Sequence, residues 1–69
     1  MISAAKPLVE FIQAYSFMPV YINPKYVASV QRHSVWTNEW TVIVCSNEKY
    51  IVLERIETVF EKLDIEKQI

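Results

Sequence analysis

The 69-residue chain contains no glycine, and this absence restricts its fold and its chemistry more than any other feature. Walker loops and dinucleotide-binding loops need glycine where the backbone approaches a phosphate or takes a positive φ. The strained turn that carries the nucleophile of α/β-hydrolases needs glycine as well. The chain therefore holds none of these motifs, and its turns depend on Asn, Ser and Pro.

The length predicts one small domain, residues 1–69, and a domain of this size buries only about 60% of the surface of its unfolded chain. Cys45 is the only cysteine and His33 the only histidine, which excludes an intramolecular disulfide and the usual structural zinc site. Hydrophobic residues make up 52% of the chain and aromatic residues 13%. We expect a dense core, an apolar surface that binds a partner, or both, and no metal or cofactor.

The start of the sequence lacks the basic residues and the long apolar run of a signal peptide, and no window is long and apolar enough to span a membrane. A single free cysteine is typical of a reducing compartment. We therefore expect a cytoplasmic protein without membrane contact. The formal net charge of −1 provides no overall basic field, so nucleic acid is not the expected partner.

The stretch YINPKYVASV, residues 21–30, has the pattern of a strand that is interrupted and then resumes. Pro24 fixes its own φ and forces Asn23 into extended geometry. We therefore expect strands over residues 19–23 and 25–32, joined by one tight corner.

The run WTVIVC, residues 40–45, and the run KYIVL, residues 49–53, predict a hairpin because Thr, Val and Ile favour strands. In its turn, Asn47 is expected to take the left-handed conformation that glycine usually supplies. Residues 33–40 are expected to form a further hairpin loop, with Thr37-Asn38 as the turn.

The two ends of the chain are less regular. Residues 8–15 combine a helical spacing of apolar residues with a strand-like alternation. Periodicity alone therefore allows both a helix and a strand in this segment. Residues 55–64 predict a helix, because an apolar stripe recurs at helical spacing in Ile56, Val59, Phe60 and Leu63. We expect an irregular start over residues 1–7 and fraying at residues 66–69.

From residue 19 to residue 63 the chain resembles the small FlbD/SwrD-type proteins associated with bacterial flagella and similar short proteins of phages and prophages. The resemblance depends on the order of the elements: Ile22-Asn23-Pro24, then Val27 and Val30, TVIV, a polar turn, KYIV, and a Val-containing helix that ends in EKL. It implies that residues 8–15 form a strand, and it implies a small non-catalytic accessory protein. Asn47-Glu48 replaces the family's Asn-Gly-like turn and Arg55 its Ser or Thr helix cap, so the flagellar role is not carried over.

These elements predict an α+β fold, in which an antiparallel meander of about five strands carries one C-terminal helix on one face. If residues 8–15 are a helix, the meander loses its first strand. The expected core contains Ile22, Val27 and Val30, either Val42 and Val44 or their alternating neighbours, and Ile51 or Val52. The choice stays open because a shift of one residue exchanges the two faces of a strand.

Four residues are predicted to bind a partner: Trp36, Arg32, Trp40 and Tyr50. Trp36 is expected to be exposed in the hairpin loop, where tryptophan is a favoured anchor for protein partners. Trp40, at the start of a strand, is expected to cover the core. His33 is expected to be solvent-exposed. Cys45 is read as an inert strand residue, since an active thiol needs a base within hydrogen-bond reach.

The chain is therefore predicted to be a non-enzymatic, protein-binding regulator or adaptor, encoded by a bacterium, a phage or another mobile element. One alternative is a phage inhibitor of a host defence or polymerase complex. A second is a binder of single-stranded nucleic acid that combines aromatic residues with Arg32 and Lys49. Open strand edges and surplus apolar surface also predict homo-oligomers.

Overall fold

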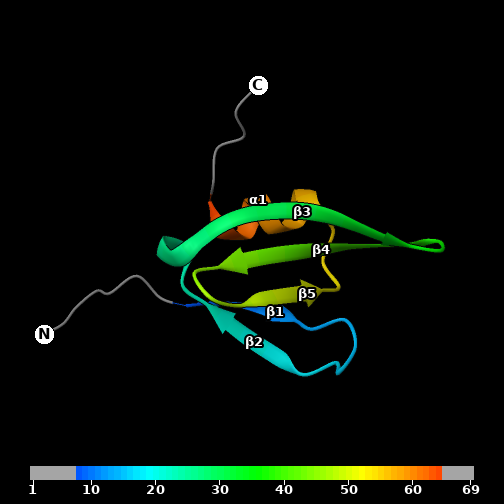
Figure 1. Ribbon diagram of the computed structural model, residues 1–69, viewed down its shortest axis with the longest axis horizontal. Coiled ribbons are helices and arrows are strands. Elements are labelled where there is room, and N and C mark those ends of the chain that lie inside the picture. Colours follow the sequence, from blue (N-terminus) through cyan, green and yellow to red (C-terminus); the bar gives the residue numbers. More distant parts are fainter. Residues whose placement is uncertain (1–7, 65–69) are drawn as a thin grey trace, which may run out of the picture.

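The computed structural model describes residues 8–64, and the expectations for the two chain ends lie outside these residues. The order along the chain is β1 (Val9–Ile12), β2 (Pro19–Ile22), the 3-10 helix η1 (Pro24–Tyr26), β3 (Val27–Val35), β4 (Asn38–Cys45), β5 (Lys49–Val52) and α1 (Ile56–Leu63). The predicted α+β class is confirmed, with five antiparallel strands and a C-terminal helix (Figure 1). Residues 8–15 form β1 and the start of a turn rather than a helix.

The interruption in YINPKYVASV is a helical corner that Asn23 caps. Its side-chain Oδ1 accepts a hydrogen bond of 2.9 Å from the backbone N–H of Lys25, and Pro24 opens the 3-10 turn. Proline suits the first position of a helical turn because its fixed φ is already helical. Strand β3 therefore begins at Val27, two residues later than the sequence pattern predicts.

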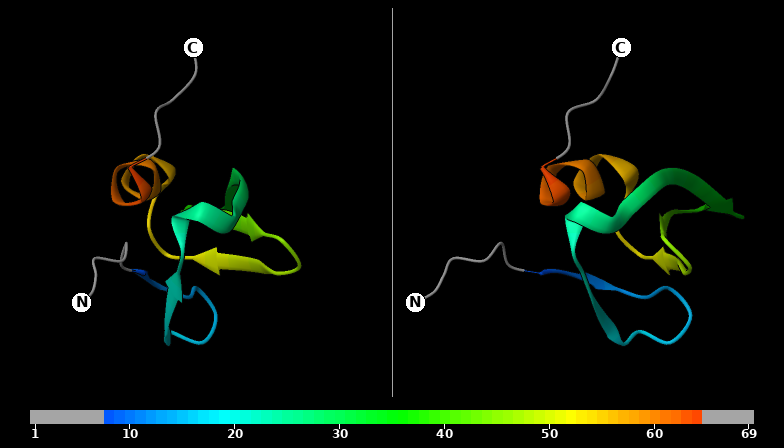
Figure 2. Two further views of the ribbon diagram at one scale, coloured as in Figure 1. Left: turned by 90° about the vertical axis from the view of Figure 1, so that its left-hand side faces the viewer. Right: turned by 60° about the vertical axis from the view of Figure 1, so that its left-hand side comes forward.

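The five strands form a two-stranded sheet, β1–β2, and a three-stranded sheet with the order β3–β4–β5. The sheets meet where β1 ends: the N–H of Leu53 donates to the carbonyl of Ile12, and the N–H of Ala14 donates to the carbonyl of Ile51, each at 2.8 Å. Gln13 forms an isolated antiparallel bridge with Val52 between these two bonds. The strands thus follow one another in space as β2, β1, β5, β4 and β3, with α1 on one side (Figure 2).

The prediction of a hairpin loop over residues 33–40 is wrong, because most of this segment is strand. His33 pairs with Trp40 and Val35 pairs with Asn38, so β3 and β4 continue to a two-residue turn at Trp36-Thr37. Cross-strand pairs of this kind stabilise a strand whose own residues are polar. The turn lies one residue earlier than the Thr37-Asn38 turn that the sequence suggests.

The turn between β4 and β5 also differs from expectation. Cys45 and Glu48 exchange two backbone hydrogen bonds, of 2.8 and 3.3 Å, around Ser46-Asn47. Within residues 8–64, the residues with positive φ are Phe17, Trp36 and Asp64, so Asn47 is not left-handed. Asp64 takes this conformation at the C-terminal cap of α1, a place where it is common.

The register of β4 decides which of its residues enter the core. Thr41 and Ile43 are fully buried and Cys45 packs against the core, so Val42 and Val44 point to the opposite face. The alternating neighbours are therefore the inward set, and on β5 it is Val52 that is buried. The buried apolar core consists of Phe11, Ile22, Ile43, Val52, Val59 and Leu63, and the expected Val27 and Val30 pack against it.

Helix α1 lies against β3 and β4 and is also attached to β1 by Lys62. The Lys62 ammonium donates a 2.6 Å hydrogen bond to the carbonyl of Glu10 and lies 4.8 Å from the centre of the Phe11 ring. It is 3.6 Å from the Glu54 carboxylate, which also accepts from the backbone N–H of Ile12 at 3.3 Å. These contacts hold α1 and the segment after β5 against β1, on the side of the strands that faces the core.

Candidate functional site

The turn between β3 and β4 holds a tryptophan in a conformation that favours glycine. Trp36 has a φ of 59°, whereas Thr37 is not among the residues with positive φ. A positive φ at only the first central residue is the pattern of a type II′ hairpin turn, whose first position is usually glycine. The Trp36 residue is 95% exposed, and the hairpin that carries it projects beyond the other strands (Figure 1).

The connection between β1 and β2 presents a second group of exposed apolar side chains. Its backbone is well hydrogen-bonded: Gln13 donates to the Met18 carbonyl, and Phe17 donates to the Gln13 carbonyl, both at 3.0 Å. Phe17 has a φ of 61°. Tyr15, Phe17 and Met18 are all more than half exposed, so backbone hydrogen bonds rather than burial of these side chains define the loop.

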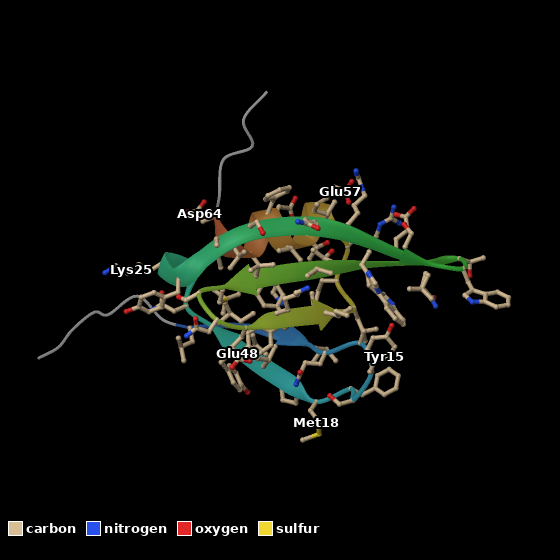
Figure 3. The ribbon with its side chains drawn as sticks, in the orientation of Figure 1. Tyr15, Met18, Lys25, Glu48, Glu57 and Asp64 are labelled. Carbon is tan, nitrogen blue, oxygen red and sulfur yellow. The ribbon has the colours of Figure 1, made fainter. Side chains whose placement is uncertain are left out.

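Trp40 connects this loop to the β3–β4 hairpin. The ring of Tyr15 meets the ring of Trp40 edge to face, with centroids 5.2 Å apart, and His33 stacks on Trp40 at 6.4 Å. The Tyr15 side chain lies at the end of the molecule toward which the hairpin projects (Figure 3). We name the five apolar residues of these two segments the aromatic end: Tyr15, Phe17, Met18, Trp36 and Trp40.

Two sequence-based expectations are corrected here. Trp40 does not join the core, because its partner across the strands is His33 and both side chains lie on the face of the sheet away from α1. His33 is half-buried rather than freely exposed, since it stacks on Trp40. Trp36 is exposed, as the sequence predicts.

The other two predicted binding residues lie elsewhere. Arg32 is on the helix side of β3, where its guanidinium is 3.4 Å from the Glu57 carboxylate. The pKa of Glu57 is lowered, first by a backbone hydrogen bond at the start of α1 and then by the charges of Arg32 and Arg55. Tyr50 is half-buried and packs against the core. Only Trp36 and Trp40, of the four predicted residues, belong to the aromatic end.

The arrangement offers no activated thiol at Cys45. Cys45 pairs with Val27 whereas His33 pairs with Trp40, and a spacing of five positions along β4 puts these two pairs about 17 Å apart. Burial raises the pKa of the Cys45 thiol, and the charge of Glu48 raises it further. A raised pKa lowers the thiolate fraction at neutral pH and with it the reactivity of the sulfur.

Across residues 8–64, no group of three or more His, Cys, Asp or Glu side chains is placed to hold a metal ion. In the same part of the chain, no helix has the length and apolar character needed to cross a bilayer.

Sequence reasoning missed Tyr15, Phe17 and Met18 as surface residues. The available indication was the composition of the segment AYSFMP, residues 14–19, in which large apolar side chains occupy a turn before a proline. Turns are usually formed by small or polar residues, so apolar side chains at such a place point to contacts outside the chain.

No protein-family model matches the chain, and neither a curated protein nor a solved structure matches it. The resemblance to the FlbD/SwrD-type proteins stays a prediction.

Proposed function

We propose that the chain is a non-enzymatic protein-binding regulator or adaptor that contacts its partner through the aromatic end. The main observation behind this proposal is the exposure of Trp36 in a turn. Its side chain is 95% exposed and adds little to the core, and its backbone conformation is one in which Gly or Asn is more stable. Folding stability therefore gives no reason for a tryptophan at this position, whereas binding does, because tryptophan is the most favoured anchor in protein interfaces.

The remaining residues of the aromatic end suit the same purpose. Phe17 and Met18 add apolar area next to Tyr15, and the flexible Met side chain adapts to the shape of a partner. Trp40 is held in place by Tyr15 and His33, which limits the side-chain entropy that binding would remove. The chemistry fits an apolar pocket or groove on another protein.

A protein fits this surface better than a nucleic acid does. Binding of single strands combines stacking with a positively charged groove, but the five residues of the aromatic end carry no charge. Arg32 is engaged with Glu57 on the helix side of the sheet. An adaptor and a phage inhibitor of a host complex would use the same surface and would differ only in the target.

The test is capture of partners from a bacterial lysate with the immobilised full chain, followed by titration of the identified partner in purified form. Trp36→Ala removes the indole and retains the β-carbon and the strained turn. We expect at least about a tenfold loss of affinity, as for a central interface anchor.

The matched control is Tyr26→Ala. Tyr26 is 60% exposed and lies in η1, at the opposite end of the molecule from the β3–β4 turn (Figure 1). Its removal should leave the affinity unchanged. Equal affinities of wild type and Trp36→Ala for every captured protein would contradict the proposal.

A further inference from the structure

The face of β3–β4–β5 that points away from α1 is apolar along its centre. Register places Val42 between Gln31 and Ile51, and Val44 between Ser29 and Lys49. Residues directly opposite one another in an antiparallel sheet point to the same face. We name the half-buried apolar residues of this face the outer patch: Val35, Trp40, Val42, Val44 and Ile51.

None of the outer-patch residues belongs to the core or to the half-buried residues that pack against it. Helix α1 lies on the other face (Figure 2). Inward residues of β1 and β2, including Phe11 and Ile22, also pack into the core on that side. Strands with apolar side chains on both faces are typical of sheets that are covered on both sides, whereas a sheet with one face in water alternates apolar and polar residues. Threonine at positions 42 and 44 would suit a water-exposed strand equally well.

We propose that a second copy of this chain covers the outer patch, so that the two three-stranded sheets pack face to face around a two-fold axis. In such packing the two sheets lie about 10 Å apart and their inner side chains interdigitate. The same patch then meets itself across the axis, as in most homodimers.

The charge distribution favours a second copy. The outward residues of the three strands include one permanent charge, Lys49, which lies at the start of β5 and away from the centre of the patch. Two identical surfaces repel each other when they carry many charges of one sign, and a nearly neutral apolar centre avoids this cost.

The area of the face agrees with a small dimer interface. With strands about 4.8 Å apart, β3 and β4 are about 30 and 27 Å long and β5 is about 14 Å long, so the face measures about 340 Å². Tyr15, which is 66% exposed beside Trp40, adds about 100 Å². Two copies would then bury about 900 Å², slightly below the roughly 1,000 Å² of a stable specific interface, so we expect a weak dimer that dissociates on dilution.

The dimer face shares Trp40 with the aromatic end and lies beside Tyr15, so the two proposals are tested at residues that they do not share. Val42 belongs to the outer patch alone, and Trp36 and Phe17 belong to the aromatic end alone. The experiment is sedimentation equilibrium of the full chain from micromolar to millimolar concentration. We expect the mass to rise from 8.1 kDa toward twice that value. Val42→Lys, at the centre of the patch, should remain monomeric throughout the range.

Tyr21→Lys is the matched control, since Tyr21 is an exposed strand residue on β2; it should dimerise like the wild type. If Val42→Lys fails to fold, as judged by circular dichroism, Val42→Cys in a Cys45→Ala background replaces it. This variant should be cross-linked between chains by a short bifunctional maleimide, because sheets about 10 Å apart hold facing residues too far apart for a direct disulfide.

A wild-type mass of 8.1 kDa at every concentration would overturn the proposal. Dimers of a folded Val42→Lys variant would also overturn it, since pairing would then use another surface, such as the open edge of β3. If the wild type is monomeric and Val42→Lys loses a captured protein that Trp36→Ala keeps, the outer patch belongs to a foreign partner.

Discussion

Trp36 and Phe17 both take a positive φ in a chain that contains no glycine. For a residue with a β-carbon this conformation costs roughly 1–2 kcal/mol. Neither side chain is buried: Phe17 is 69% exposed and Trp36 is 95% exposed. The cost is therefore not offset by packing within residues 8–64, which is typical of positions selected for contacts with other molecules.

Trp36→Asn should stabilise the fold, because Asn tolerates the positive φ of such hairpin turns and lacks the extra unfolded-state entropy of glycine. We expect the free energy of unfolding to increase by about 0.5–1 kcal/mol, measured by urea denaturation below the concentration of any dimer. Trp36→Ala is the control and should change little, since it retains a β-carbon in the same turn. Equal stabilities of the Asn and Ala variants would show that the turn is not strained.

At the scale of the element, helix α1 begins without a side-chain cap. Arg55 occupies the N-cap position with extended geometry, and its side chain makes no capping hydrogen bond. It pairs instead with Glu39, at 3.1 Å on the exposed surface. Arg55→Ser should supply the missing acceptor for the first turn, a gain of about 1 kcal/mol, against a loss of at most about 1 kcal/mol for the exposed ion pair.

We expect thermal denaturation to show Arg55→Ser as stable as the wild type or about 0.5 kcal/mol more stable. Arg55→Ala loses the ion pair and gains no cap, so it should be the less stable of the two variants by about 1 kcal/mol. Similar stabilities for Ser and Ala would mean that the first turn of α1 is satisfied without a cap.

The β3–β4 hairpin is the element that local patterns describe least well. Its end contains His33, Ser34, Asn38 and Glu39, which have weak strand preferences, so the sequence predicts a loop. The strands extend to the turn because all of these residues have partners across the hairpin. Ser34 pairs with Glu39, His33 with Trp40 and Asn38 with Val35. Pairing across strands is a non-local property, and periodicity within one segment does not reveal it.

At the scale of the whole molecule, Glu54 connects three elements. Its carboxylate, only 17% exposed, accepts from the N–H of Ile12 on β1 and lies 3.6 Å from Lys62 on α1. Its backbone carbonyl accepts a 2.7 Å hydrogen bond from the buried Thr41 hydroxyl on β4. Removal of the side chain leaves the backbone N–H of Ile12 and the Lys62 ammonium without this acceptor.

Glu54→Ala should lower the free energy of unfolding by about 1–3 kcal/mol, the range for a partly buried group that loses its acceptor. Glu39→Ala is the control, because the Glu39 carboxylate is in an exposed ion pair worth at most about 1 kcal/mol. Urea denaturation of both variants at one protein concentration provides the comparison. Equal losses would mean that the Glu54 side chain does not connect β1 to the helix.

The sequence by itself determined the features that depend on neighbouring residues. Asn23-Pro24 makes the corner because proline and the Asn side chain act on adjacent backbone atoms. The β4–β5 hairpin and α1 follow from β-branched runs and from an apolar stripe at helical spacing. The exposure of Trp36 follows from its place in a turn.

The tertiary structure alone decided which face of β4 is the core. The run TVIVC has apolar residues on both faces, so neither face is preferred locally. Packing against Val59 and Leu63 of α1 and Phe11 of β1 selects Ile43 and leaves Val42 outside. The position of Trp40 follows from the same choice, because alternate residues of a strand point in opposite directions and one buried position assigns all the others.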